Sequence, residues 1–309
     1  MSALTNRIWV SLALVGVAVV WGGTFVVVKD AIEIYPVFAF LGWRFWIAVI
    51  AFLLIFPSVI RKLDRKTIAV GIFAGAFLCL GFVFQTIGLQ GTTASRAAFI
   101  TGLFVVITPL LQALLLRRMP SAMVAIGALI ALVGLWFLSG GNNGSWQAGD
   151  TSVLVAAFAY SAHIIILGSI GRRHAVLPLT FVQLAFMAVV CSGVSLVTEP
   201  IALPGAGSVW LAILFTGVLA SAVAFAVQTY AQRHISPART ALILITEPAF
   251  GGVFGWLAGD VFTIGAIAGA ALILAGMILS EIVSLRKADR DTIVHETTIE
   301  GPSVAMMRE

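Results

Sequence analysis

The sequence predicts an all-α integral membrane protein in which ten transmembrane helices form two inverted repeats of five. Three observations predict this class. The 309 residues are 61% hydrophobic and only 10% charged, with a mean hydropathy of +1.09, which leaves too little polar surface for a soluble protein of this length. Apolar runs long enough to cross a bilayer follow one another with short breaks. Segments of the first half also recur in the second half.

The apolar segments are separated by short loops that carry proline, glycine or charge. The first is too long for the apolar core of a signal peptide and lacks a convincing cleavage site. The predicted segments are residues 8–28, 37–56, 67–89, 95–116, 121–138, 151–170, 177–198, 208–232, 237–259 and 262–284. We therefore expect a first repeat over 1–139, a second over 140–285 and a polar cytoplasmic tail over 286–309.

The repeat is visible as matched polar residues at one constant offset. Gln85-Thr86, Arg96 and Ala98 in the first half correspond to Gln228-Thr229, Arg239 and Ala241 in the second. Pro109 then matches Pro248 after a shift of about one helical turn. A repeated interruption of this kind is typical of secondary transporters, whose substrate sites lie near the middle of the membrane between the repeats.

Positive charge predicts the orientation. If the segments alternate, fifteen basic residues fall on one side: Arg7, Arg61, Lys62, Arg65, Lys66, Arg117, Arg118, Arg172, Arg173, Arg233, Arg239, Arg286, Lys287, Arg290 and Arg308. The other side receives only Lys29 and Arg96, and Arg44 lies within a segment. The positive-inside rule then places both termini in the cytoplasm of a multi-pass protein of the cytoplasmic membrane.

We expect the helices of two proline-containing segments to be interrupted. Proline lacks a backbone N–H and clashes with the carbonyl four residues earlier, so Pro109 and Pro248 leave the carbonyls of Val105 and Leu244 available. Lipid offers such groups no partner. We therefore predict that both prolines mark helix breaks that line a central, partly wet cavity.

Glu247 is an ionisable residue near the middle of the ninth segment, where a charge costs roughly 3 kcal/mol. At about 1.5 Å per residue, Arg44 in the second segment lies at a similar depth. Two alternatives remain open. An unpaired Glu247 would exchange a proton or receive a substrate ammonium, whereas a Glu247–Arg44 ion pair would hold the two halves together. Arg44 alone could also clamp backbone carbonyls.

The sixth segment places Tyr160 and His163 near midplane, about one turn apart and on roughly one face. His163 can titrate in the physiological range, which suits proton coupling or substrate contact, although a buried histidine bonded to a neighbouring carbonyl is the plainer interpretation. Trp21 and Thr24 occupy the matching positions of the first segment. An aromatic-lined site would bind apolar or aromatic side chains.

Enzymatic motifs are absent from the sequence, so we predict no catalytic residue, no metal and no cofactor. Cys79 and Cys191 both lie within apolar runs and have no metal-ligand spacing. The basic residues mark topology, and we expect no nucleic-acid partner. An intramembrane enzyme is a weaker alternative, because the symmetry-related helix breaks favour alternating access. A channel is also weaker, because no ring-forming filter motif appears.

Several stretches resemble the EamA family of the drug/metabolite transporter superfamily. They are TTASRAAFITGLFVVITPLL, AQRHISPARTALILITEPAFGGVFGWLAGD, the opening VVWGGTFVVVKDAI, the Pro36…Arg44 spacing and GDTSVLVAAFAYSAHIII. The resemblance implies a carrier of small metabolites, with a site lined mainly by segments one, three, four, six, eight and nine. Gly259-Asp260 departs from the Gly-Glu of many relatives, and the first segment lacks the acidic residue of the small multidrug members.

The sequence as a whole predicts a secondary transporter in the lipid bilayer that exports amino acids or related amphipathic metabolites by alternating access. A multidrug carrier or a nucleoside or sugar carrier of the same architecture is the alternative, and proton coupling stays open. The predicted partner is a small-molecule substrate. Glycines four residues apart, as at Gly71 and Gly75, permit close helix packing, and we favour intramolecular packing and a monomer over a dimer.

Overall fold

The computed structural model describes residues 3–117, 119–138, 146–231 and 243–280, and this part of the chain is built of helices. The labelled helices, in chain order, are α1 (Ala3–Ile34), α2 (Val37–Ile55), η1 (Pro57–Lys62), α3 (Arg65–Leu89), α4 (Ala94–Gly102), α5 (Phe104–Leu115), α6 (Ala122–Leu138), α7 (Ala148–Ser169), η3 (Gly171–Arg173), α8 (Val176–Thr198), α9 (Gly207–Leu214), η4 (Phe215–Val223), α10 (Ala224–Ala231) and α12 (Glu247–Leu257). A further apolar helix spans Ile264–Ser280.

Seven helices in the described ranges are long and apolar enough to cross a membrane, and two shorter apolar helices span Ala122–Leu138 and Ile264–Ser280. This confirms the all-helical membrane class. The number of ten crossings and their inverted arrangement remain predictions. Part of the ninth predicted segment, 237–259, and the tail 286–309 lie outside the described residues.

Side chains and special backbone positions set several helix ends. Asp64 accepts a hydrogen bond from the Thr67 backbone N–H at 2.6 Å and caps α3, and this bond holds the pKa of Asp64 below its usual range. Thr93 caps α4 through the Arg96 backbone N–H. Gly259 ends α12 with φ +105°, a left-handed conformation that favours glycine.

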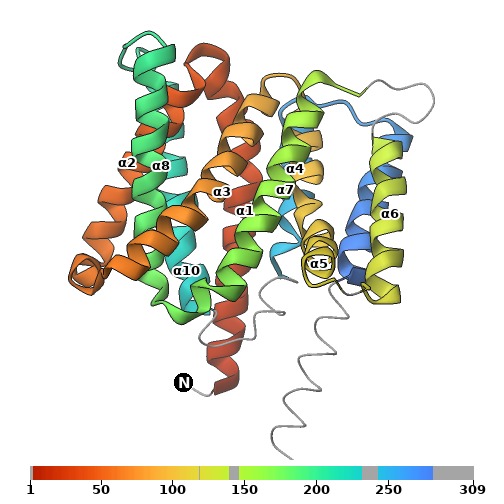
Figure 1. Cartoon of the computed structure of the whole chain (residues 1–309). Coiled ribbons are helices and arrows are strands. Elements are labelled where there is room, and N and C mark those ends of the chain that lie inside the picture. Colours follow the sequence, from red (N-terminus) through yellow and green to blue (C-terminus); the bar gives the residue numbers. More distant parts are fainter. Residues whose placement is uncertain (1–2, 118, 139–145, 232–242, 281–309) are drawn as a thin grey trace, which may run out of the picture.

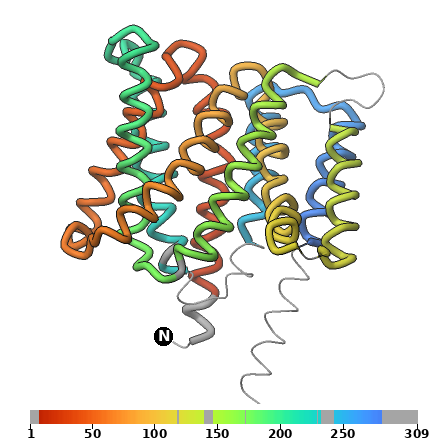
Figure 2. The backbone as a smooth tube through the Cα atoms, viewed as in Figure 1, coloured from red at the N-terminus to blue at the C-terminus, as the bar shows by residue number. Residues whose placement is uncertain are grey.

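The helices pack side by side with an outer pair at each of two opposite sides (Figure 1). One side holds α2 against α8, and the other holds α6 against the helix Ile264–Ser280. Between them lie α1, α3, α4 and α7, and the tube in Figure 2 shows the chain turning sharply between α4 and α5. The first helix of each half packs on the other half: α7 contacts α3, α4 and α5, while α1 contacts η4, α10 and α12.

Glycines allow this close packing. A Cβ on Gly71 or Gly75 would meet α8 at Val182 or at Gln183 and Phe186. These predicted small-residue positions therefore serve helix contacts within the chain. Across α6, a Cβ on Gly134 would lie 2.7 Å from the Ile273 backbone nitrogen.

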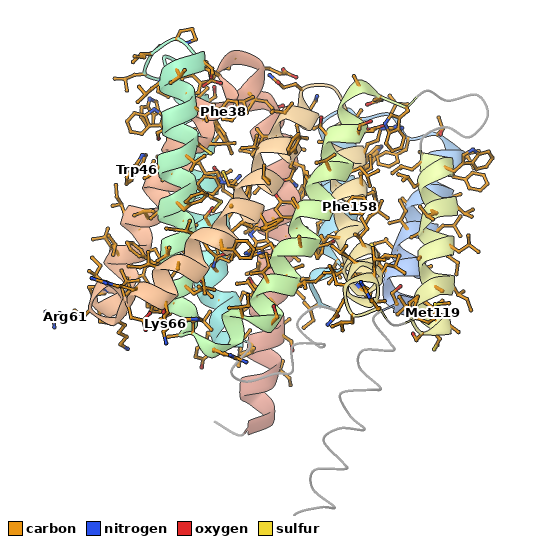
Figure 3. The ribbon with its side chains drawn as sticks, viewed as in Figure 1. Phe38, Trp46, Arg61, Lys66, Met119 and Phe158 are labelled. Carbon is orange, nitrogen blue, oxygen red and sulfur yellow. The ribbon has the colours of Figure 1, made fainter. Side chains whose placement is uncertain are left out.

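The outer surface of the packed helices is apolar, as a lipid-facing surface should be. Trp46 and Phe158 point outward in Figure 3 and are 40% and 50% exposed. Arg61 and Lys66 lie at the end of the molecule where the N-terminus lies, whereas Phe38 lies at the opposite end. The structure thus separates a basic end from an end that carries Asp150, Glu199 and Asp260.

A buried ion pair joins three helices at the end opposite the N-terminus. Arg96 of α4 pairs with Asp150 of α7, which is fully buried, and Arg96 Nη1 donates to the Leu138 carbonyl at the end of α6 at 2.7 Å. Asp150 also accepts hydrogen bonds from Thr92 and from the Gln147 backbone N–H. The ion pair was not expected from the sequence, in which Arg96 served only as a marker of the repeat and of topology.

A second carboxylate at this end fastens α2 to α8. Both oxygens of Glu199, which ends α8, accept hydrogen bonds from the backbone N–H groups of Phe38 and Ala39, at 2.9 and 2.7 Å. A carboxylate at these free amides also complements the dipole of α2. Tyr35 donates to the Ala202 carbonyl at 2.8 Å nearby.

Candidate functional site

Both halves contain an interrupted helix, and the two interruptions fall at repeat-related positions. α4 ends at Gly102 and α5 begins at Phe104, so the break lies at Leu103. In the second half a turn at Ile245–Thr246 precedes α12. Leu103 and Thr246 are related by the same offset as Arg96 and Arg239.

The position of the first break differs from the prediction. α5 runs through Pro109, and the interruption lies at Leu103. Near this break the carbonyl of Phe104 accepts hydrogen bonds from the hydroxyls of Thr108, at 2.7 Å, and Ser161, at 3.2 Å. Side-chain hydroxyls thus satisfy the backbone where the helix is irregular.

Pro248 lies in the first turn of α12, directly after the second break. A proline is tolerated there because its missing N–H is one that the helix leaves unpaired anyway. Pro248 is buried, and a Cβ on Gly102 would lie 2.6 Å from Pro248 Cγ. The two interrupted helices therefore touch at their breaks.

A chain of hydrogen bonds connects α7, α3 and α4 beside these breaks. The Tyr160 hydroxyl donates to Gln85 Oε1 at 2.9 Å, and Gln85 Nε2 donates to Thr101 Oγ1 at 3.1 Å. Gly81, one turn from Gln85, leaves room for the Tyr160 ring, because a Cβ there would lie 2.9 Å from Tyr160 Cζ and closer to other ring atoms. Three membrane segments are thus joined at one polar point.

Arg44 of α2 lies against the same aromatic side chains. Its Cζ is 4.7 Å from the centroid of Phe82 and 5.4 Å from that of Phe45. Phe82 in turn meets Tyr160 edge to face at 5.7 Å. Arg44 is only 4% exposed, and its Nε has no hydrogen-bond partner among the described residues.

Glu247 completes this cluster from α12. It lies half-buried in the first turn of that helix, where the helix dipole favours a negative charge. The next residue, Pro248, packs on Gly102, which adjoins Thr101 of the hydrogen-bonded chain. In the described part of the chain no ion pair joins Arg44 to Glu247, so the paired alternative is not the arrangement in this structure.

His163 is held by a different neighbour. Its Nε2 lies 2.6 Å from Gln183 Oε1 of α8, and Gln183 Nε2 donates to the Leu179 carbonyl at 3.1 Å. A carbonyl only accepts, which fixes the orientation of the Gln183 amide, so Nε2 of His163 must carry the proton. The recorded polar contact of His163 is thus to α8, and none joins it to Tyr160.

Trp21 and Thr24 form a separate group on α1. Trp21 Nε1 donates to the Ala220 carbonyl at 2.7 Å, and Thr24 donates to the Trp21 carbonyl at 2.6 Å. Ala220 lies in η4, a π-helix inside the membrane span Gly207–Gln228 that the sequence predicted as uninterrupted. Such segments widen the helix and occur often at functional sites. Trp21 and Tyr160 therefore form equivalent contacts, because each donates a hydrogen bond to the third segment of the opposite half.

Sequence reasoning missed Phe82, Thr101 and Gln183 as neighbours of the site, and it used Gln85 only as a marker of the repeat. In the structure Gln85 bonds between helices, to Tyr160 and Thr101. The repeat of Gln85-Thr86 as Gln228-Thr229 was the available signal.

Comparison with known proteins agrees with this architecture. A family model described as the EamA-like transporter family matches residues 8–140 and again 147–282. An uncharacterized transporter of Archaeoglobus fulgidus is 33% identical over 282 residues, covering 91% of this chain and 87% of that protein. The uncharacterized transporter YoaV of Bacillus subtilis is 24% identical over 290 residues, covering 90% and 98%. A solved structure titled only as the crystal structure of a protein shares the fold with a TM-score of 0.64 at 19% identity, covering 89% of this chain and 98% of that one. The chain belongs to the EamA-like transporter family.

Proposed function

We propose that this membrane transporter is a secondary carrier that exports amino acids or related amphipathic metabolites across the cytoplasmic membrane. Its two five-helix repeats, inverted relative to each other, expose one site alternately to either face. The observation that carries the proposal is the meeting of two repeat-related helix breaks, next to the hydrogen-bonded chain of Tyr160 and to Glu247. Among the described residues neither Arg44 nor Glu247 forms an ion pair. Interrupted helices at the repeat interface are where secondary transporters bind their substrates.

The exchange of partners between halves supports the inverted arrangement. α7 packs on the third and fourth segments of the first half, and α1 packs on the corresponding segments of the second. The first helix of each half thus packs against the other half. Rocking of one half against the other would change the surroundings of the breaks from both sides at once.

The distribution of charge supports cytoplasmic termini. Arg61 and Lys66, at the basic connection from α2 to α3, lie at the N-terminal end of the molecule (Figure 3). The positive-inside rule assigns that end to the cytoplasm. The end with Asp150, Glu199 and Asp260 then faces outward.

Counterflow in proteoliposomes tests the carrier. Vesicles loaded with unlabelled L-phenylalanine are expected to accumulate labelled L-phenylalanine transiently and with saturation. A screen of other amino acids, nucleosides, sugars and cationic drugs extends the test to the remaining solutes. Conductance without saturation would favour a channel, and saturable counterflow of drugs, sugars or nucleosides alone would replace the amino-acid assignment.

Glu247→Gln is expected to keep expression and folding but to lower counterflow about 10-fold or more, because it removes a charged partner for a substrate ammonium or a proton. The dependence of flux on pH should flatten in the same variant. Glu33→Gln, an exposed carboxylate at the end of α1, is the matched control and should transport normally. Unchanged transport by Glu247→Gln at every pH would remove Glu247 from the mechanism.

A further inference from the structure

Arg44 is a buried cation that has no counterion among the residues the structure describes. It sits in the middle of α2 with 4% exposure, and its Nε is buried without an acceptor. No hydrogen bond or ion pair to Arg44 is formed by any residue that the structure describes. Buried guanidinium groups are normally paired, because a buried N–H donor without an acceptor costs free energy.

The aromatic neighbours of Arg44 do not satisfy these donors. Phe82 and Phe45 lie at 4.7 and 5.4 Å from Cζ and interact with the positive charge through their π systems. A guanidinium carries five N–H groups in its own plane, and an aromatic ring accepts none of them as a carboxylate would. The stack therefore holds and orients the group while its hydrogen-bonding edge stays free.

The surroundings of Arg44 indicate which kind of ligand could accept hydrogen bonds from its guanidinium group. Arg44 stacks on Phe82, which meets Tyr160 edge to face. Tyr160 is joined through Gln85 to Thr101, and the neighbouring Gly102 packs on Pro248, which follows Glu247 in the chain. The two opposite charges therefore border one neighbourhood, and no ion pair joins them in the described part of the chain. A ligand that is only an anion would be repelled by Glu247, and one that is only a cation would be repelled by Arg44. A molecule with both charges, separated by a short spacer, neutralises both.

We propose that Arg44 binds the carboxylate of a zwitterionic substrate, with Glu247 receiving its ammonium group and the rings of Phe82 and Tyr160 contacting its side chain. This assignment rests on the proposed carrier function and restricts it. It selects α-amino acids with apolar or aromatic side chains over cationic drugs, sugars and nucleosides, which lack a carboxylate. The guanidinium fork matches a carboxylate with two parallel hydrogen bonds, which an ammonium at the same position would not provide.

The test compares three ligands on the purified protein: L-phenylalanine, L-phenylalaninamide and phenethylamine. They share the ammonium and the ring, and the first alone carries a carboxylate. Binding is measured by competition against labelled L-phenylalanine and by thermal shift. We expect the amide and the amine to bind about 10- to 100-fold more weakly than the acid, the usual effect of losing a hydrogen-bonded charged partner.

Variants at Arg44 provide the second part of the test. Arg44→Gln should remove the preference for the acid over the amide, and Arg44→Lys should restore part of it because it keeps the charge but loses the fork. If either variant fails to fold, the ligand series on the wild-type protein still decides. Equal affinity for acid and amide would overturn the assignment, as would the absence of L-phenylalanine binding or an unchanged preference in a folded Arg44→Gln protein.

Failure of this assignment is distinguishable from failure of the carrier. Saturable counterflow of a solute without a carboxylate would leave the carrier in place and remove Arg44 from substrate recognition. Equal affinity of the wild-type protein for L-phenylalanine and its amide, with intact counterflow, has the same meaning. Only the absence of counterflow for every solute in the screen would reject both.

Discussion

Asp150→Ala is expected to destabilise the protein by about 3–5 kcal/mol, the usual cost of leaving one member of a buried ion pair without its partner. Asp150 is fully buried and pairs with Arg96, and it also accepts from Thr92 and the Gln147 backbone. Its removal would leave the Arg96 guanidinium with the Leu138 carbonyl as its remaining recorded acceptor. The measurement is the midpoint of thermal or denaturant unfolding in detergent.

The effect of Asp150 should be specific to its pairing with Arg96. In the double variant Asp150→Leu/Arg96→Met both charges are gone, so its loss of stability should be smaller than the sum of the two single losses. Asp150→Asn keeps the shape and one acceptor and should fall between wild type and Asp150→Ala. Additive losses in the double variant would show that the pair contributes no coupling at this end of the protein.

Gly22→Ala is expected to lower stability by roughly 1–3 kcal/mol and to abolish most transport, because overpacking a tight contact forces the helices apart. A Cβ on Gly22 of α1 would lie 2.7 Å from Phe250 Cβ, 2.8 Å from the Gly251 nitrogen and 3.0 Å from the Glu247 carbonyl oxygen. Two of these are backbone atoms and cannot move aside alone. The displacement would fall on the first turn of α12, which carries Glu247.

Gly16→Ala is the matched control in the same helix. Nothing lies within 4 Å of a Cβ at Gly16, so alanine there should be neutral or stabilise by about 0.5–1 kcal/mol through helix propensity. Unfolding midpoints and counterflow are compared for the two variants. Equal behaviour of Gly16→Ala and Gly22→Ala would mean that α1 and α12 do not pack as closely as described.

Much of the fold could be predicted from the sequence because lipid restricts the alternatives. A long apolar run in a membrane must be a helix, since every backbone group has to be bonded internally. Its ends then follow from residues such as Pro36 and Asp64, which begin α2 and α3. The π-helical stretch η4 could not be predicted in this way, because it depends on the contact of Ala220 with Trp21 on another helix.

The sequence could predict how deep in the membrane the candidate site residues lie, but not the direction in which their side chains point. Counting residues from the ends of segments identified Arg44, Tyr160 and Glu247. The structure links Arg44 to Tyr160 through Phe82. It places Pro248, the residue after Glu247, against Gly102 at the end of the Tyr160–Gln85–Thr101 chain. Counting does not give the rotation of a helix about its axis, so it could not separate His163, which bonds to α8, from Tyr160 on the same helix. The roles of these residues in binding remain proposals.

The interruption at Leu103 shows why local rules were insufficient. Proline is the strongest local signal for a break, yet α5 continues through Pro109. The break instead falls where Gly102 packs against Pro248 of the other half and where Ser161 of α7 reaches the Phe104 carbonyl. These partners are distant in the sequence, so only the folded chain reveals the position.

Access to the site from both faces of the membrane tests the central claim most directly. In a background with Cys79→Ala and Cys191→Ala, Thr101→Cys replaces a buried residue of the hydrogen-bonded chain by one of similar size. A membrane-impermeant thiosulfonate is applied to oriented vesicles from each side, with Leu129→Cys, on the apolar surface of α6 and 63% exposed, as the unreactive control. The account predicts labelling of Thr101→Cys from either side and protection by L-phenylalanine, whereas labelling from one side alone or from neither would contradict alternating access.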